Sequence, residues 1–111
     1  MPYSTKQFLA ITKIDRWRAN YIICNCKHLF KLIPLGRGKV RKFSREEIEC
    51  LFLMDFISKK MKLLEAEKVV VQWLKSGKQN AVEFHFPYGC ITFECKKILD
   101  QIRNKLYGAT K

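Results

Sequence analysis

The chain has 111 residues, of which 48% are hydrophobic and 13% aromatic. This length suits one domain with a single core, and the composition excludes intrinsic disorder. Its 22 Lys and Arg against 10 Asp and Glu give a net charge of +12; residues 1–45 contribute +10, from 11 basic residues and one acid. No apolar run reaches the roughly 18 residues of a membrane span, and no signal-peptide core is recognisable. We therefore expect a soluble, cytoplasmic protein whose N-terminal part faces a polyanion.

Two short helices are predicted near the N-terminus. Ser4 and Gln7 match a capping box that opens a helix over about residues 5–10. Thr12 is expected to cap a second helix, which ends near residue 20. A short helix, a tight connection and a basic second helix form a helix-turn-helix pattern. The second helix is expected to bury Ile14, Trp17 and Tyr21.

The other side of this second helix is the predicted recognition surface. Arg side chains read guanine in pairs of hydrogen bonds, and Asn reads adenine in the same way. A merely solvated helix face is the alternative. The candidate DNA-binding residues are Lys13, Arg16, Arg18 and Asn20.

Residues 22–43 are predicted to form a β-ribbon, or wing. One arm covers residues 26–33, a turn with two glycines covers 34–38, and the returning arm covers 39–43. The tip and the returning arm contain basic residues and no acid, so we expect them to grip phosphates or to enter a minor groove. A soluble hairpin tip is the alternative. These residues are Arg37, Lys39, Arg41 and Lys42.

Two longer helices should follow the wing. Ser44 and Glu47 form a capping box, and the acids that follow Ser44 suit the positive end of a helix. This helix is expected to end near Lys60. The apolar spacing predicts another helix over residues 64–75, with Gly77 as its C-terminal stop.

The C-terminal part reads as a β-hairpin over residues 81–95 and a helix over about 96–107, because polar and apolar residues first alternate and then recur at helical spacing. A two-stranded ribbon cannot bury this much apolar surface alone. Either it packs on the rest of the chain or it pairs with another copy, and we favour a homodimer. The candidate dimerisation residues are Phe84, Phe86, Ile91, Phe93, Ile98 and Ile102.

Some of the cysteines are candidate metal ligands. Cys24, Cys26 and His28 alternate, so on a strand they would share a face, but no fourth ligand for a closed zinc site lies nearby. Thiols packed in the protein are the favoured interpretation. Cys90 and Cys95 would face opposite sides of a regular strand. We expect free thiols, no metal site and no cofactor.

His85, with Glu83 and Glu94 nearby in the sequence, is a candidate for acid–base catalysis. No nucleophile, glycine-rich phosphate loop or paired carboxylate accompanies these residues. An exposed face of the hairpin is favoured, and we expect that the protein is not an enzyme.

Residues 41–48 read Arg-Lys-Phe-Ser-Arg-Glu-Glu-Ile, and Leu51 follows. This segment resembles the motif that joins the wing to the third helix in MerR-like winged helix-turn-helix proteins. The resemblance covers about residues 3–76 and is closest to small phage or mobile-element members. It implies a mainly α fold with a small β component, in which a four-helix MerR-like unit with a β-wing occupies residues 1–77. The hairpin and last helix, residues 78–111, would then be the dimerisation element.

We expect a sequence-specific transcriptional regulator that binds double-stranded DNA as a homodimer and associates with the nucleoid. Recognition would use residues 13–20, and the wing over residues 34–43 would anchor phosphates. Contact with RNA polymerase is left open. Two alternatives also stay open: a non-transcriptional DNA-binding protein, such as an excisionase or a packaging-site recognition subunit, and an RNA-binding protein. The core-like spacing of the aromatics in residues 1–45 weighs against single-strand recognition.

Overall fold

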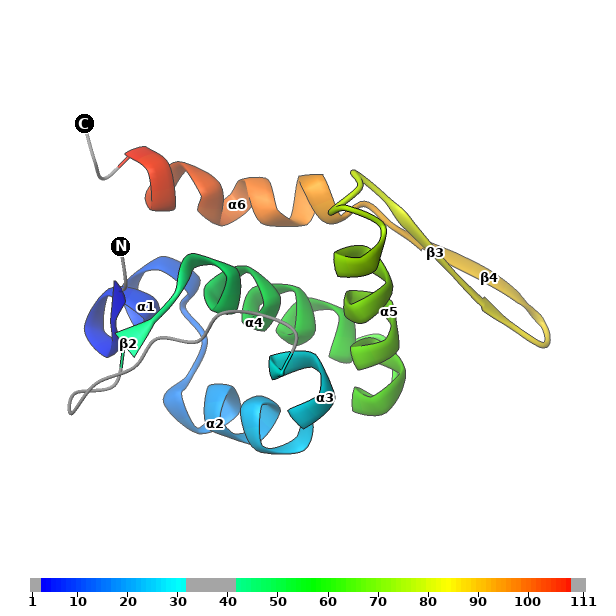
Figure 1. Ribbon diagram of the computed structural model, residues 1–111, viewed down its shortest axis with the longest axis horizontal. Helices are drawn as coiled ribbons and strands as arrows, with labels where there is room; N and C mark the ends of the chain where they lie inside the picture. Colours follow the sequence, from blue (N-terminus) through cyan, green and yellow to red (C-terminus); the bar gives the residue numbers. More distant parts are fainter. Residues whose placement is uncertain (1–2, 32–41, 109–111) are drawn as a thin grey trace.

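The computed structural model describes residues 3–31 and 42–108 of the chain (Figure 1). These residues form helices and two small antiparallel sheets, so the expected mainly α fold with a small β component is confirmed. Within the described ranges, no helix is both long and apolar enough to cross a membrane. The elements in chain order are β1 (Tyr3–Ser4), α1 (Thr5–Thr12), α2 (Arg16–Asn25), α3 (Lys27–Phe30), β2 (Lys42–Phe43), α4 (Arg45–Ser58), α5 (Leu63–Lys75), β3 (Val82–Phe86), β4 (Gly89–Phe93) and α6 (Cys95–Gly108).

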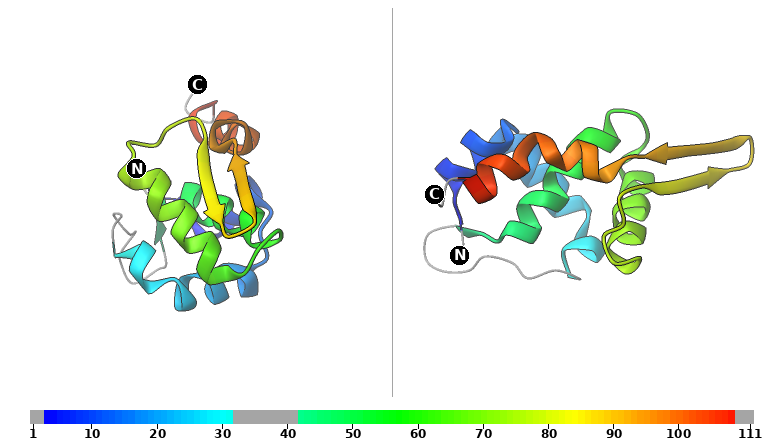
Figure 2. Two further views of the ribbon diagram at one scale, coloured as in Figure 1. Left: turned by 90° about the vertical axis from the view of Figure 1, so that its right-hand side faces the viewer. Right: turned by 90° about the horizontal axis from the view of Figure 1, so that it is seen from above.

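Helix α4 lies at the centre of the molecule. Helices α2 and α6 pack on opposite sides of it, and α5 packs against it as well (Figures 1 and 2). Hydrophobic side chains therefore line α4 almost all the way round. Those with no exposed surface are Ile48, Cys50, Leu51, Leu53, Met54 and Ile57.

The hairpin and α6 share this core with the N-terminal helices. Val82 and Phe93 at the base of the hairpin belong to the same buried cluster as α4, and so does Leu99 of α6. Buried Glu49 of α4 accepts a hydrogen bond from Arg103 of α6, with 3.2 Å between the Oε2 and Nε atoms. The described residues from 78 to 108 thus contribute to the same hydrophobic core as those that precede them.

Both predicted capping boxes are present, and each one positions a helix. The Ser4 hydroxyl accepts from the backbone N–H of Gln7 at 3.1 Å, and the Gln7 side chain accepts from the Ser4 N–H at 2.8 Å. At α4, Ser44 and Glu47 make the same reciprocal pair, at 3.1 and 3.4 Å. Each pair satisfies two donors that a helix start leaves open.

Ser4 lies on strand β1, and Ser44 directly follows strand β2. β1 and β2 are antiparallel, with Tyr3 opposite Phe43 and Ser4 opposite Lys42. Beside this pair, the ring of Phe43 stacks on Phe8 of α1, with centroids 4.4 Å apart. The start of the chain is thereby tied to the segment that leads into α4.

The predicted first arm of the wing, residues 26–33, is wrong where the structure describes it. Helix α2 continues to Asn25, and Lys27–Phe30 form the short helix α3. Leu29 and Phe30 are buried, and the Leu29 N–H donates to Glu67 of α5 at 3.0 Å. A short apolar run has no periodicity that separates a strand from a helix, so packing against α5 decides its conformation. The predicted turn at 34–38 lies outside the described residues.

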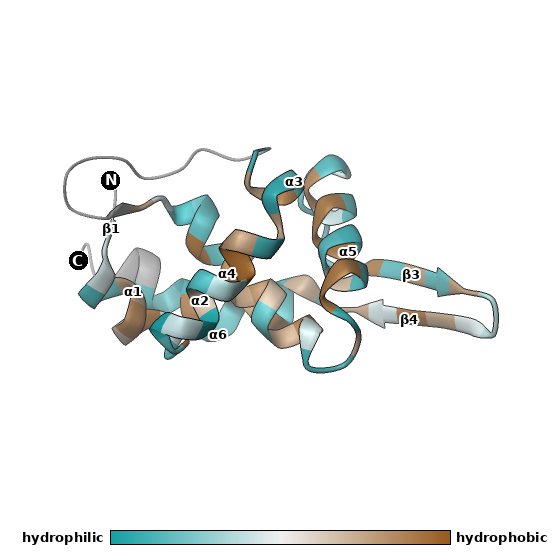
Figure 3. Ribbon diagram, turned by 90° about the horizontal axis from the view of Figure 1, so that it is seen from below, coloured by the Kyte–Doolittle hydropathy of each residue, from teal (hydrophilic) through white to brown (hydrophobic). Residues whose placement is uncertain are grey.

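The C-terminal elements agree with the predictions. Helix α5 ends at Lys75, and Gly77 follows with a φ of 82°, a conformation that glycine adopts at a helix end. In the hairpin, Phe84 lies opposite Ile91 and His85 opposite Cys90. The alternation of polar and apolar residues along β3 is visible in Figure 3. The hairpin projects from one end of the helical body (Figures 1 and 2).

The cysteines differ in burial, which predicts two classes of thiol. Cys24 and Cys90 are exposed. Burial raises the pKa of Cys26 to about 12 and that of Cys95 to about 11, and it raises the pKa of Cys50 further. Because the thiolate is the reactive form, we expect Ellman's reagent to modify Cys24 and Cys90 rapidly in the folded protein at about pH 8. The other three should react only after unfolding; rapid reaction of all five thiols would contradict the fold.

Candidate nucleic-acid interface

The turn between α1 and α2 is held by Thr12. Its hydroxyl donates to the Phe8 carbonyl oxygen at 2.9 Å and accepts from the Ile14 N–H at 3.2 Å. Lys13 adopts a left-handed conformation, with a φ of 58°. Its N–H donates to the Leu9 carbonyl oxygen at the end of α1. Thr12 and Ile14 are both buried. These contacts fix the direction in which α2 leaves the turn.

The predicted boundaries of the second helix are therefore wrong. Thr12 is the last residue of α1 and does not cap α2, because its hydroxyl is already used inside the turn. Helix α2 begins at Arg16, after Asp15 at its N-cap. This change rotates the buried face of α2. The side chains turned to the core are those of Ala19 and Ile22.

Trp17 and Tyr21 lie on the outer face of α2, and the prediction that they are buried is wrong. Trp17 is 82% exposed and Tyr21 is 53% exposed. They are four residues apart, so they form one row along the helix. Arg16 and Asn20 are also exposed and form the neighbouring row. We call these four residues, Arg16, Trp17, Asn20 and Tyr21, the α2 outer face.

The spacing of the apolar residues contained a signal for this register. Ala19, Ile22 and Cys26 recur at intervals of three and four, which is the pattern of a core-facing helical stripe. All three are buried. Reading α2 from this stripe places Trp17 and Tyr21 outside.

Arg18 differs from the other predicted recognition residues. Its Nε donates to Asp55 of α4 at 3.2 Å, and its Nη2 donates to the hydroxyl of Ser58. The guanidinium also lies 5.9 Å from the centroid of the Tyr21 ring. Arg18 therefore joins α2 to α4. Its predicted contact with DNA stays a prediction.

Exposed basic residues occur at the start of α2 and in the segment that follows it. Lys13 and Arg16 are exposed, and so are Lys27 and Lys31 of the next segment. Neither Lys13 nor Arg16 forms an ion pair with any described residue. Asp15 is the single acid of the first 45 residues. A polyanion would therefore find basic side chains here with little competition from acids.

Two acids outside α2 join it or the segment after it to the other helices. Asp55 of α4 forms an ion pair with Arg18 of α2, at 3.2 Å, and one with Lys59, at 3.4 Å. Glu67 of α5 accepts the hydrogen bond from the Leu29 N–H. Both carboxylates therefore have partners within the fold.

The predicted wing contacts fall mostly outside the described residues. Arg37, Lys39 and Arg41 belong to the range 32–41, which the structure does not describe. Lys42 lies in β2, where it pairs with Ser4 of β1. The four side chains therefore remain predicted phosphate contacts.

The predicted dimerisation residues divide into two groups. Phe93, Ile98 and Ile102 are 4%, 5% and 2% exposed, so they serve the core of their own chain. Phe84, Phe86 and Ile91 are half-buried on the projecting hairpin, and Tyr88 at its tip is 99% exposed. Only the second group presents apolar surface that a second copy would cover.

The candidate metal ligands Cys24, Cys26 and His28 lie along α2, the residue after it and α3. Cys24 is exposed near the end of α2, Cys26 is buried, and His28 is exposed on α3. Within the described residues these three side chains do not form a metal-ligand group. Glu94 pairs with Lys97 at 3.3 Å, whereas Glu83 pairs with His85 at 3.4 Å.

Comparison with protein-family models, with curated proteins and with solved structures finds no match to this chain.

Proposed function

We propose that the protein is a sequence-specific, duplex-DNA-binding transcriptional regulator that uses the α2 outer face for recognition. The observation that carries the proposal is this exposed face on a helix whose first turn is held in place. Thr12 fixes the turn before α2, and Arg18 ties α2 to α4. A rigid helix with exposed basic and amide side chains suits the major groove.

Each residue of the face has a role in this proposal. Arg16 reads guanine, and Asn20, one turn further along, reads adenine. Trp17 and Tyr21 supply apolar contact to thymine methyl groups and sugars beside them. Lys13 binds a phosphate at the helix start, where it also orients the protein on the duplex.

The wing and a second copy complete the proposed interface. The basic residues of the segment before α4 neutralise phosphates of an adjacent groove; they are Arg37, Lys39, Arg41 and Lys42. A homodimer doubles these contacts and matches an inverted-repeat site. The half-buried hairpin residues Phe84, Phe86 and Ile91 support such pairing.

A second candidate is single-stranded RNA or DNA binding, which the exposure of Trp17 and Tyr21 favours. Bases stack on exposed aromatic rings without regard to duplex geometry. The expectation that all aromatics of the N-terminal part serve the core weighed against this candidate, and the 82% exposure of Trp17 removes that argument. We rank it second because Arg16 and Asn20, on the same helix, can hydrogen-bond to base edges in the major groove.

A fluorescence-anisotropy titration decides between the two candidates. The full chain is titrated into labelled random-sequence duplex DNA, duplex RNA and single strands at two salt concentrations. We expect the tightest binding to duplex DNA, with log Kd rising with log salt by roughly 0.9 for each phosphate that the protein neutralises. Preference for single strands would support the second candidate, and the absence of binding to all probes would reject both.

A further inference from the structure

The face of the hairpin opposite Phe84 and Ile91 groups three different metal-ligating side chains. We propose that Glu83, His85 and Cys90 bind one zinc-class divalent ion, with water as its fourth ligand. One ligand atom from each residue lies within 4.8 Å of the others. His85 and Cys90 are direct cross-strand partners, and Glu83 is two residues before His85 on the same face of β3.

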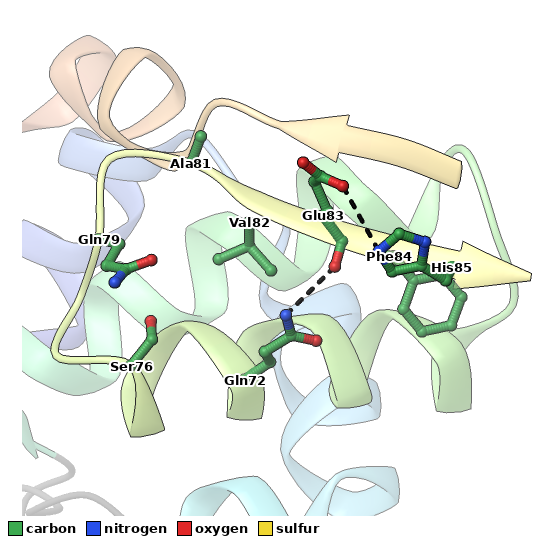
Figure 4. Close-up of a pocket in the computed structure, with 8 residues that line it drawn as sticks. All are labelled: Gln72, Ser76, Gln79, Ala81, Val82, Glu83, Phe84 and His85. Atoms are coloured by element: carbon green, nitrogen blue, oxygen red, sulfur yellow. Dashed lines mark hydrogen bonds and ion pairs between the residues drawn. The ribbon is translucent and has the colours of Figure 1, made fainter. Parts of the chain in front are cut away.

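The spacing of the Glu83 and His85 ligand atoms suits a tetrahedral ion. Glu83 Oε2 and His85 Nε2 are 3.4 Å apart (Figure 4). Two ligands at the zinc–oxygen and zinc–nitrogen distances of about 2.0–2.1 Å, separated by a tetrahedral angle, lie roughly 3.3 Å apart. An ion can therefore replace this contact without moving the two side chains away from each other.

The ligand set selects the kind of ion. One thiolate, one imidazole and one carboxylate favour zinc over magnesium or calcium, which prefer oxygen ligands alone. Three protein ligands with one open position are also typical of zinc sites that keep a water. Cys90 is exposed, so its thiol meets solvent and metal directly, unlike the buried Cys95 nearby.

The backbone below the site is held in place. Val82 and Phe93 anchor the base of the hairpin in the core, and the Gln72 amide of α5 donates to the Glu83 carbonyl oxygen at 3.2 Å (Figure 4). Two of the ligands lie on β3 and one on β4, so an ion would cross-link the strands. A two-stranded ribbon is only marginally stable by itself, and metal bound to the folded form alone stabilises it by mass action.

A cobalt and zinc titration of the full chain tests the site. Cobalt(II) bound to a thiolate absorbs in the near ultraviolet, so this band reports a cysteine ligand. We expect one equivalent of cobalt to produce the band and zinc to displace it. Cys90→Ser should abolish the band, and Glu83→Gln should weaken zinc binding by about 100-fold, because even loss of a group behind a ligand costs about 10- to 100-fold.

Cys24→Ser is the matched control, since Cys24 is the other exposed thiol. This variant should bind cobalt like the unaltered chain. Loss of the band in Cys24→Ser with retention in Cys90→Ser would place the metal near α3 and overturn the proposal. Absence of the band in the unaltered chain would overturn it as well. Circular dichroism checks that each variant is folded, which we expect because all three altered side chains are exposed.

Discussion

Replacing each of the two tryptophans with alanine is expected to give opposite results. Trp73 is 1% exposed, and its indole N–H donates to the Gln79 carbonyl oxygen at 3.1 Å. Trp73→Ala should lower the free energy of unfolding by about 3–5 kcal/mol, because it leaves a large cavity in the core. Trp17→Ala should change that free energy by no more than about 0.5 kcal/mol, as is usual for an exposed side chain. Denaturant unfolding followed by far-ultraviolet circular dichroism measures both.

The total stability of a domain is about 5–15 kcal/mol, so Trp73→Ala leaves a marginal fold. Trp73→Phe serves as the milder variant, because it keeps a ring in the core and loses the hydrogen bond to Gln79. It should cost about 1–3 kcal/mol. If Trp17→Ala destabilised the protein as much as Trp73→Ala, the register of α2 described here would be wrong.

Removing the α2 side chains that are proposed to hydrogen-bond to base edges is expected to weaken DNA binding without affecting the fold. Arg16→Ala should reduce affinity for a selected duplex site by about 5- to 150-fold, which corresponds to the roughly 1–3 kcal/mol of a side chain–base pair. Asn20→Ala should have an effect of similar size at a neighbouring base pair. Both side chains are exposed, so thermal unfolding should be unchanged.

The control for Arg16→Ala is Lys105→Ala. Lys105 is exposed on α6, which packs on the side of α4 opposite α2 (Figure 1), so its loss removes the same charge away from the α2 outer face. Titrations of both variants with the same labelled duplex separate a local contact from the general effect of net charge. Equal weakening by the two substitutions would show that the α2 outer face is not the site of recognition.

The elements that sequence reasoning predicted well are those that local chemistry determines. The serines at positions 4 and 44 each face a residue three positions later that completes a capping box. The hairpin follows from strict alternation on either side of a turn. In these segments a few neighbouring residues contain the whole signal, so no distant contact is needed to place them.

Prediction failed where a residue had two local uses and the tertiary structure chose between them. Thr12 can cap a following helix, but its hydroxyl instead bonds back to Phe8. The sequence of Lys27–Phe30 is compatible with a strand or a helix, and packing on α5 makes it helical. Because Ile14 lies before α2, it does not define the buried face of this helix, and Trp17 and Tyr21 lie on the exposed side.

The candidate metal site shows a different limit. Glu83 and His85 were recognised as sharing a face, but Cys90 lies on the other strand, and its alignment depends on the register of the turn. The observed register puts His85 opposite Cys90. A shift by one residue would have placed this thiol on the apolar face. Only the pairing itself brings the three ligands together.

The most direct test of the proposed interface is a titration of the ¹⁵N-labelled full chain with duplex DNA, followed by NMR. The chain contains two tryptophans, and a Trp17→Phe spectrum assigns their indole N–H signals. We expect the Trp17 signal to shift or broaden on binding, while the buried Trp73 signal, hydrogen-bonded to Gln79, stays in place. Saturated binding that leaves the Trp17 signal unchanged would contradict recognition by the α2 outer face.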